Sequence, residues 1–471
     1  MKKLLFALVA AAAAGCCSLC DKPSCCPNDY PENVEEGFVG LFDGQTFLGW
    51  EGDLAAFSGE FNPLVGYMGS GKNRKPFCSD GYALCYTPAK DGKPQKIYTK
   101  KEYDNFVLRF CYLMTSNAVA DVGIRTPVKA CPRKDGIEIA LADDFGLEKT
   151  ALPADQFSGS IVDFKASRRE ENIRLDWKHE SGNTYAKPVD KWNMVEVRAV
   201  GERVTVMLNG EIVSDATVKG RPAKGRIVLV GKDKPVKWMH LRVKRVCPNW
   251  KPNCCKCSAR TPAGFTPLFT GCPKQFEENW KGVTTEEQFD RPWVRQAATP
   301  AKRAEMQKKA DELMRKFWSV RDGTLFFDGK KGGYSLATKK DYGDFEMYAD
   351  WRILTVTGDS GFYPRGVCQV QIWDAHNMWH LGSGGLYNNK ENERHAMSIA
   401  DKQAGDWNRC YLKMVGDRIT VRLNGVTVVD DVPLENANAK KWPGPIPACE
   451  QLELQCHGDP LEFRNIFIRE L

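Results

Sequence analysis

The sequence repeats itself at long range. Residues 192–215 and 407–430 align without a gap at a constant offset of 215 positions, and 12 of the 24 aligned residues are identical. Both stretches open with Trp-Asn and contain Leu-Asn-Gly. A match of this length within 471 residues indicates two diverged copies of one domain. Weaker echoes at other offsets predict that loops of different lengths separate the matched segments.

Each copy contains a strand–turn–strand pattern. Residues 204–208 and 419–423 alternate β-branched or apolar residues with others, and Asn209-Gly210 or Asn424-Gly425 follows. Asn-Gly provides the two positive φ angles that a type I′ hairpin requires. Many short segments of this kind, with few helical ones, predict an all-β fold with a two-sheet β-sandwich in each half. Residues 300–317 are the exception, and their helical spacing predicts a short helical insertion in the second half.

The N-terminus has the pattern of an export signal. Lys2 and Lys3 precede an apolar run at residues 4–14, which is too short to span a bilayer. Residues 13–16 resemble a lipoprotein box, so residues 1–16 are predicted to be a signal peptide with Cys16 as the lipidation site. Ordinary cleavage after the small residues is the alternative. We therefore expect an exported protein, in the periplasm or at the cell surface, that touches a membrane only through a lipid anchor.

Cysteine-rich segments separate the expected domains. Residues 17–36 and 247–264 are rich in Cys and Pro and lack periodicity. We interpret the first as a tether and the second as a linker between β-sandwiches at residues 37–246 and 265–471. In an exported chain, cysteine clusters predict disulfides. Zinc is the alternative at residues 254–257, which lack both a second cysteine pair and a nearby histidine.

The distribution of charge along the sequence indicates which kinds of partner the chain can bind. The formal net charge of +7 is spread along the chain, without a basic stripe interleaved with aromatic residues. This distribution favours solubility and argues against a nucleic-acid partner.

The second half resembles a known family in an ordered series of motifs. The motifs lie at residues 265–269, 318–323, 342–346, 359–365, 369–374, 384–387, 405–408, 454–458 and 463–466. Together they resemble the 3-keto-disaccharide hydrolase domain, whose members are concanavalin A-like jelly rolls. Residues 37–246 resemble the same family, notably at residues 41–44. The first copy departs from the pattern because residues 227–232 lack the His-Gly pair found at residues 457–458. The resemblance implies two tandem copies, of which the N-terminal one is diverged and non-catalytic.

Strand parity provides a test that does not depend on the resemblance. Side chains alternate between the faces of a strand, so Gln369, Gln371 and Trp373 share one face. Amides bond sugar hydroxyls, and an indole stacks on the apolar face of a sugar ring. A solvated outer face with one exposed Trp is the alternative. The corresponding face of the first copy has Glu138 and two alanines, which cannot bond or stack in this way.

His457 is the strongest catalytic candidate, because an imidazole titrates near neutral pH and can take or give a proton. Asp374 could act as a base, orient His457 or bind a metal, or it could simply form a turn. Gln371 completes the predicted catalytic set. The predicted substrate-binding residues are Gln369, Trp373, Arg365, Tyr387 and Arg464. For each arginine, a surface salt bridge is the alternative.

The resemblance implies glycoside substrates that are oxidised at C3. A 3-keto group acidifies the C2 proton, so that one base can remove it and the C1 substituent can leave by β-elimination. Water can then add to the enone, giving net hydrolysis. The site needs a base, a proton donor, and positive charge at the keto oxygen. A divalent metal ion with unknown ligands is the one cofactor considered for that oxygen.

Two other classes of function are alternatives to an enzyme that cleaves 3-keto-glycosides. Jelly-roll glucanases place acidic residues together on one strand, and no such motif is present, which argues against a two-carboxylate glycosidase. A non-catalytic carbohydrate-binding or cell-surface protein on the same fold is the main alternative, because fold alone does not determine function.

Overall fold

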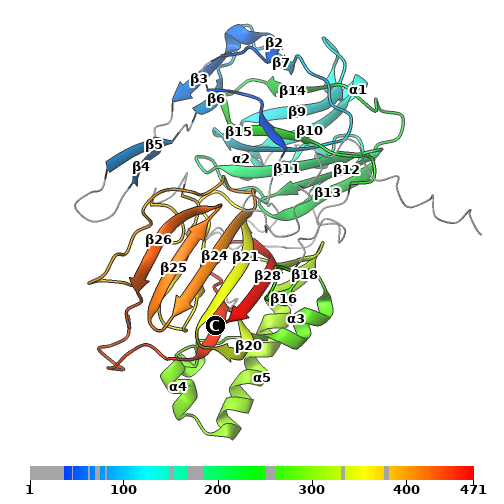
Figure 1. The fold of residues 1–471 in the computed structure, drawn as a ribbon. Helices are drawn as coiled ribbons and strands as arrows, with labels where there is room; N and C mark the ends of the chain where they lie inside the picture. The colour runs from blue at the N-terminus through cyan, green and yellow to red at the C-terminus, as the bar shows by residue number, and fades with distance from the viewer. Residues whose placement is uncertain are drawn as a thin grey trace, which may run out of the picture.

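The computed structural model describes residues 37–44, 46–61, 64–68, 75–79, 82–147, 153–167, 185–250, 261–329, 335–375 and 381–471. The predicted signal peptide with Cys16, the tether at residues 17–36 and the cysteines at residues 254–257 lie outside these residues. Two β-sandwiches occupy the described chain, one in each half (Figure 1). The all-β fold class predicted from the sequence is confirmed.

The first sandwich pairs an eight-stranded sheet with a five-stranded sheet. The large sheet has the order β13-β12-β11-β8-β15-β6-β3, and β1 pairs with β15. Its strands are β1 (Phe38–Gly40), β3 (Phe57–Phe61), β6 (Tyr82–Tyr86), β8 (Phe106–Met114), β11 (Asn193–Val200), β12 (Arg203–Leu208), β13 (Glu211–Thr217) and β15 (Val236–Arg245). The small sheet has the order β10-β9-β14-β7-β2. Its strands are β2 (Trp50–Gly52), β7 (Gln95–Thr99), β9 (Val119–Thr126), β10 (Ile137–Ala142) and β14 (Arg226–Gly231). A separate two-stranded sheet pairs β4 (Leu64–Met68) with β5 (Lys75–Ser79).

The second sandwich repeats this topology. Its large sheet has the order β18-β19-β28-β21-β24-β25-β26, and β16 pairs with β28. The strands are β16 (Thr266–Phe269), β18 (Trp318–Arg321), β19 (Thr324–Phe327), β21 (Phe345–Ile353), β24 (Asn408–Val415), β25 (Arg418–Leu423), β26 (Val426–Pro433) and β28 (Leu461–Glu470). The small sheet has the order β17-β20-β27-β22-β23. The strands are β17 (Trp280–Gly282), β20 (Leu336–Tyr342), β22 (Asp359–Tyr363), β23 (Val370–Trp373) and β27 (Glu450–Leu454). An apolar core fills the space between the two sheets of each sandwich.

The repeated Trp-Asn and Asn-Gly pairs form the same structure in both copies. Asn209 and Gly210 have φ of 47° and 90°, and Asn424 and Gly425 have 50° and 84°, as the type I′ prediction requires. The Asn209 side chain accepts from Met194 N at 2.9 Å and donates to Asn193 Oδ1 at 2.8 Å. The Asn424 side chain makes the equivalent bonds, to Arg409 N and Asn408 Oδ1. These side-chain bonds explain why both asparagines recur, and the positive φ explains the glycine.

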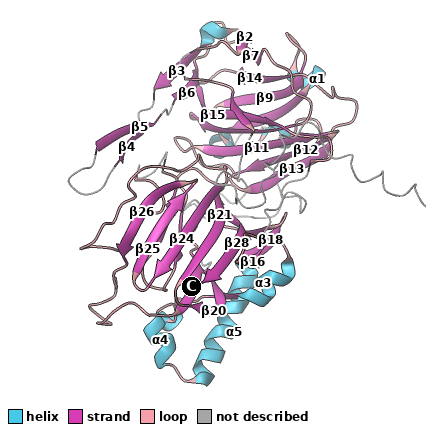
Figure 2. Cartoon of the chain, viewed as in Figure 1, coloured by secondary structure: helices cyan, strands magenta, loops and turns pink. Residues whose placement is uncertain are grey.

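Short helices accompany the sheets (Figure 2). They are α1 (Pro132–Asp135), α2 (Asp144–Leu147), α3 (Pro273–Asn279), α4 (Pro292–Ala297) and α5 (Pro300–Phe317), with 3₁₀ turns η1 (Leu54–Ala56), η3 (Ala154–Gln156) and η4 (Glu286–Gln288). The predicted insertion is α5, whose N-cap Thr299 accepts from Lys302 N at 3.2 Å. It packs closely on β17, because a Cβ on Gly282 would lie 2.0 Å from Ala310 O. None of the helices in the described ranges is long and apolar enough to cross a membrane.

The cysteines whose side chains are described form no disulfide, so the structure does not support the disulfide prediction for them. Cys247 and Cys272, which flank the linker, are free thiols. The other seven cysteines whose side chains are described also form no disulfide, and Cys111, Cys368 and Cys410 among them are buried. These three behave as small apolar residues of the interior.

A chain of charged side chains crosses the junction between the sandwiches. Glu196 on β11 contacts Arg109 and Arg198 of its own domain, at 2.7 and 2.6 Å, and Arg352 of the second domain at 3.4 Å. Arg352 also contacts Glu462 at 2.5 Å. All five side chains are almost completely buried, so each charge needs the others.

The chain of charges continues through Asp406, which lies just before β24. Asp406 contacts Arg109 at 2.5 Å and Arg242 at 2.9 Å, both from the first domain. Apolar side chains from the two domains surround the charges; these are Ala83, Cys111, Met194, Met239, Phe326, Leu354, Val356 and Ala404. The two sandwiches therefore share one buried interface.

Replacement of Glu196 tests this interface. Burial opposes ionisation of Glu196, but Arg198, Arg109 and Arg352 outweigh it and hold its pKa well below 4.5. We expect Glu196→Gln to lower the free energy of unfolding by about 3–5 kcal/mol at neutral pH, because the arginines lose their shared carboxylate. A depressed folded-state pKa gives stability that is complete above pH 4.5 and is lost as the pH falls toward the folded-state value. The difference between the two proteins should therefore shrink below pH 4.5 in chemical denaturation curves.

Asp215→Asn is the matched control for this measurement. It breaks the Arg203–Asp215 pair on the exposed surface of the same sheet, and such pairs contribute about 1 kcal/mol or less. An equal loss in both variants would contradict the proposed importance of the interface.

Candidate functional site

The outer face of the small sheet in the second domain is polar. Alternate residues of β22, β23 and β27, such as Phe362, Ile372 and Leu452, belong to the core. The residues between them therefore point outward. This outward set is Asp359, Gly361 and Tyr363, then Gln369, Gln371 and Trp373, then Gln451, Glu453 and Gln455. The parity predicted for Gln369, Gln371 and Trp373 is confirmed.

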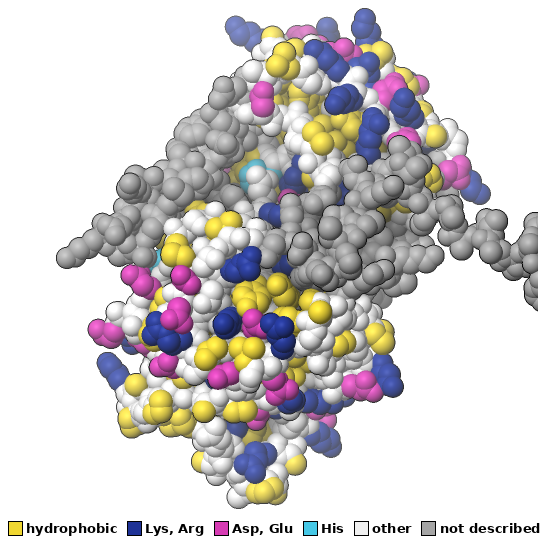
Figure 3. Space-filling view, in the orientation of Figure 1, with side chains coloured by type: hydrophobic (Ala, Val, Ile, Leu, Met, Phe, Trp, Pro, Cys, Tyr) yellow, Lys and Arg dark blue, Asp and Glu magenta, His cyan; other side chains and the backbone are white. Residues whose placement is uncertain are grey.

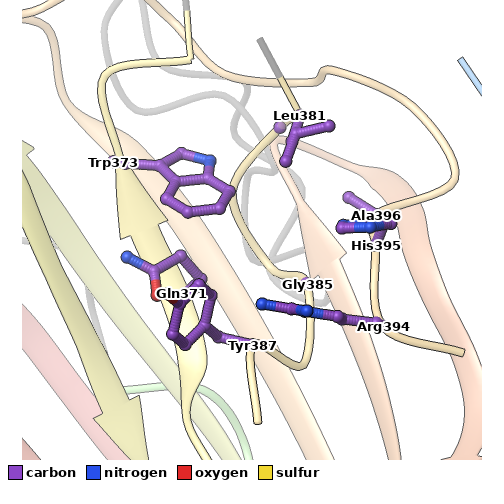
Figure 4. Close-up of a pocket in the computed structure, with 9 residues that line it drawn as sticks. Gln371, Trp373, Leu381, Gly385, Tyr387, Arg394, His395 and Ala396 are labelled. Atoms are coloured by element: carbon purple, nitrogen blue, oxygen red, sulfur yellow. The ribbon is translucent and has the colours of Figure 1, made fainter. Parts of the chain in front are cut away.

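A small hollow opens beside β23 (Figure 4). It is lined by Gln371, Trp373, Leu381, Gly382, Gly385, Tyr387, Arg394, His395 and Ala396, and its volume is about 10 Å³, room for about one water molecule. The rings of Trp373 and Tyr387 meet edge to face, with centroids 6.2 Å apart. The Arg394 guanidinium lies 4.8 Å from the Tyr387 centroid. The hollow thus combines aromatic rings, an amide and a cation.

His457 joins this face through a carboxylate. His457 Nδ1 lies 3.7 Å from Asp359 Oδ2, and Gln371 Nε2 donates to Asp359 Oδ1 at 2.5 Å. Burial raises the pKa of Asp359, while His457, Gln371 and the Ser360 amide oppose the rise. The His457 side chain is 56% exposed, so it is anchored on one side and open to solvent on the other. Asp359 therefore lies between His457 and Gln371, whereas His457 is not among the residues that line the hollow.

A second polar group lies farther along the same face. Glu453 is buried beneath α4, where Arg295 approaches it at 3.9 Å and contacts Glu450 at 2.9 Å. Gln451 donates to Glu453 at 2.7 Å. Burial raises the pKa of Glu453 to about 7, and Glu450 and Asp290 add to the rise. This carboxyl group can carry a proton near neutral pH.

Backbone hydrogen bonds show which residues of the first domain stand at the positions of the hollow. Gly384 N donates to Gln371 O, and Gly159 N donates to Ala140 O in the same way. Ser383 Oγ bonds both backbone groups of Trp373, and Ser158 Oγ bonds both of Ala142. By the same comparison Val162 occupies the position of Tyr387, because each donates its amide to the strand, to Glu138 O and Gln369 O. The first domain therefore lacks the amide and both aromatic rings.

The position of His457 is also changed in the first domain. Ile227 N bonds Thr99 Oγ1 as Leu452 N bonds Thr338 Oγ1, which aligns Lys232 with His457. Lys232 Nζ lies 2.7 Å from Asp121. A lysine ammonium paired with a carboxylate therefore stands in the first domain where the second domain has an imidazole.

Comparison with protein families decides the assignment. The 3-keto-alpha-glucoside-1,2-lyase-like domain matches twice, at residues 37–244 and 264–469. The chain belongs to this family. It is a carbohydrate-active protein with two lyase-like domains in tandem, and the resemblance inferred from the sequence motifs is confirmed.

Two solved structures are also similar to this lyase-like chain. A protein provisionally named a glycosyl hydrolase, from Parabacteroides distasonis, is 18% identical with a TM-score of 0.30, and the match covers 42% of this chain and 99% of that one. A carbohydrate-binding module from Bacillus subtilis is 13% identical with a TM-score of 0.24, covering 42% and 95%. No curated protein matches the chain.

Both predicted arginines of the second lyase-like domain lie away from the hollow. Arg365 is fully buried and donates to the carbonyls of Tyr342, Gly343 and Gly416. Arg464 is on β28 of the opposite sheet, where its guanidinium stacks 3.9 Å from the Trp407 ring centroid. Their prediction as substrate-binding residues is corrected: both hold the fold together. Proximity along the sequence to a family motif misled the prediction.

Two further predicted residues are structural. Asp374 is buried and accepts from Thr357 N at 3.0 Å, so its carboxylate holds the loop before β22 and does not face the hollow. Gln369 is on the polar face, but its amide donates to Gln455 Oε1 at 2.6 Å and to Ser360 O at 2.9 Å beneath the surface. Gln371, Trp373 and Tyr387 are the predicted residues that line the hollow.

Several polar residues of the face were missed by the sequence prediction. Asp359, Glu453 and Gln455 lie in short stretches where polar residues occupy every second position, which is the same signal that revealed Gln371. Arg394 and His395 carry no such signal, because they lie in an irregular loop whose path brings them to β23.

The metal prediction has limited support from the described residues. None of them forms a group of three or more His, Cys, Asp and Glu side chains that could hold a metal ion. Asp359 and His457 provide two adjacent donors on the polar face. A divalent ion therefore stays a prediction.

The charge on the surface of the lyase-like chain is mixed. On the face drawn in Figure 3, basic and acidic side chains are interspersed over both domains, in agreement with the even spread of charge along the sequence.

Glu453 generates a prediction of pH dependence. A folded-state pKa of about 7 lies above the ordinary glutamate value of 4.5, so the stability that the neutral carboxyl contributes is complete below pH 4.5 and is lost as the pH rises to about 7. Glu453→Gln stays neutral and avoids this loss. We expect the variant to gain unfolding free energy relative to the parent between pH 5 and pH 8, measured by chemical denaturation. The exposed Glu278→Gln is the control, and an equal pH trend in both variants would contradict the assignment.

Proposed function

We propose that the second domain cleaves 3-keto-glycosides by β-elimination, with His457 as the base. The proposal rests on the strip in which Asp359 links His457 to Gln371, next to a hollow lined by Trp373 and Tyr387. Asp359 lies 3.7 Å from one imidazole nitrogen, and the other side of the exposed ring can reach a substrate. This is the arrangement that a general base needs.

The proposed reaction uses few groups. His457 takes the proton from C2 of the keto sugar, the C1=C2 double bond forms, and the C1–O bond breaks. The departing oxygen receives a proton, so that the products are an enone and a free aglycone or sugar. Arg394 supplies positive charge near the hollow for the keto oxygen, where negative charge develops as the C2 proton leaves. Gln371 and the aromatic rings orient the sugar. Addition of water to the enone would complete a hydrolysis.

The comparison of the two copies supports the choice of domain. The same backbone framework carries Gln371, Trp373, Tyr387 and His457 in the second copy, and alanines, valine and lysine in the first. The framework survives without the polar groups, so these side chains are not required by the fold. We infer that they are retained for a ligand.

We also propose that the protein works outside the cytoplasm. Lys2, Lys3 and the apolar run at residues 4–14 support export, and Cys16 is proposed as the lipid-bearing residue. A keto-glycoside in the periplasm or at the cell surface is then the proposed substrate.

The test measures aglycone release from a chromogenic 3-keto-α-glucoside. We expect His457→Ala to reduce kcat/KM by at least about 100-fold, because general-base catalysis contributes about 10²–10⁴-fold. Asp359→Asn should also reduce it, since it frees both His457 and Gln371. Parallel reactions with and without a chelator test the metal prediction.

Lys232→Ala is the matched control, because it changes the equivalent position of the first domain and should leave kcat/KM unchanged. Full activity in folded His457→Ala would overturn the catalytic assignment. Binding of the keto-glucoside without release of the aglycone would favour the carbohydrate-binding alternative instead.

A further inference from the structure

One lysine of the first domain is inserted into the second. Lys187 lies in the segment before β11, and its side chain is buried at the junction of the domains. Its ammonium donates to Val356 O at 2.8 Å. The Lys187 backbone is held by the side chain of Asn193, which accepts from Lys187 N at 2.6 Å and donates to Lys187 O at 3.3 Å. The hydrogen bonds from Asn193 thus hold the backbone from which this side chain crosses the interface.

The segment that receives Lys187 is the loop between β21 and β22, residues 354–358. Thr355 Oγ1 donates to Asp459 Oδ1 at 3.0 Å, and Thr357 N donates to Asp374 Oδ2 at 3.0 Å. Thr357 has φ of 69°, a conformation that β-branched residues rarely adopt. Such a residue persists only where its surroundings over-determine it. Lys187, Asp374 and Asp459 provide those surroundings.

This loop leads directly into the polar face. Asp359 is the next residue after it, and Asp359 N donates to Asp459 Oδ2 at 3.2 Å. The side chain of Asp359 then holds both His457 and Gln371. A continuous set of contacts therefore runs from Lys187 through the loop and Asp459 to the proposed base.

We propose that Lys187 is a positioning residue of the second domain's active site, supplied by the first domain. Its ammonium fixes the loop through Val356 and balances the carboxylates of Asp374 and Asp459, so that Asp359 is held where it orients His457. The domain that lacks the sugar-binding side chains thereby retains a role in catalysis. This inference rests on the function proposed above for that site.

The charges around Lys187 agree with this role. Burial lowers the pKa of Lys187 to about 8, and Asp459 and Asp374 oppose the fall. Burial raises the pKa of Asp459, which Lys187 in turn lowers. The other ionisable groups that act on Lys187 are Cys111, whose pKa burial raises to about 12, and Lys191. In the folded protein, Lys187 therefore begins to lose its charge as the pH rises through about 8.

The experiment compares Lys187→Met and Lys187→Arg with Lys191→Met in the full-length chain. Lys191 is an exposed lysine of the same segment and is the matched control. Hydrogen–deuterium exchange reports on residues 354–359, and aglycone release from the chromogenic 3-keto-α-glucoside reports on catalysis as a function of pH. Exchange does not require activity, so it tests the positioning separately from the proposed function.

We expect Lys187→Met to increase exchange in the loop and to reduce kcat roughly tenfold to 100-fold with little change in KM, because misplacement of a catalytic group costs rate more than binding. Lys191→Met should change neither quantity. In the parent, kcat should fall above pH 8, and this inflection should be absent from Lys187→Arg, whose guanidinium stays protonated.

The outcomes separate the two hypotheses. Increased exchange in Lys187→Met, together with an inactive parent, would support the positioning and overturn the proposed function. Unchanged exchange and unchanged kcat in Lys187→Met would overturn the positioning role. If Lys187→Met does not fold, Lys187→Arg decides, because an alkaline inflection that persists in that variant contradicts a role for the Lys187 charge.

Discussion

The buried carboxylate of Glu196 is the interaction on which the arrangement of the two domains depends. It is shared by guanidinium groups from both sandwiches, and the chain of charges extends to Asp406 on one side and Glu462 on the other. A buried ion is costly unless every partner is present, so such a network permits one docking geometry and penalises others. The apolar side chains around it add attraction but little direction. The fixed docking is what allows a side chain of one domain to reach a loop of the other.

The polar face of the second domain depends indirectly on how the two domains dock. The hollow and the Asp359–His457 contact belong wholly to the second domain, yet the loop that precedes Asp359 is held partly by the first. The duplication therefore produced more than a spare copy. One sandwich carries the amide and aromatic side chains of the hollow, and the other keeps the same framework without them and contacts the loop before Asp359.

The fold was largely predictable from the sequence, because its signals are local. Asn-Gly turns, alternation along strands and the repeated Trp-Asn pair specify hairpins and registers without knowledge of distant contacts. The site was predictable only where it follows strands: parity found Gln371 and Trp373. Arg365 and Arg464 were misassigned because sequence proximity does not show whether a guanidinium faces solvent or backbone carbonyls. Arg394 and Lys187 were missed because their positions are set by an irregular loop and by domain docking.

The Asn-Gly turns have a further consequence for the lifetime of the protein. In flexible chains this dipeptide deamidates readily, when the backbone nitrogen of the glycine attacks the asparagine carboxamide. Here the Asn209 side chain is fully buried, and its amide donates to Asn193 Oδ1 and Tyr185 O. Conversion to aspartate would place a negative charge against both acceptors, at the cost of two buried hydrogen bonds. The bonds that shape the hairpin therefore also protect it from chemical ageing.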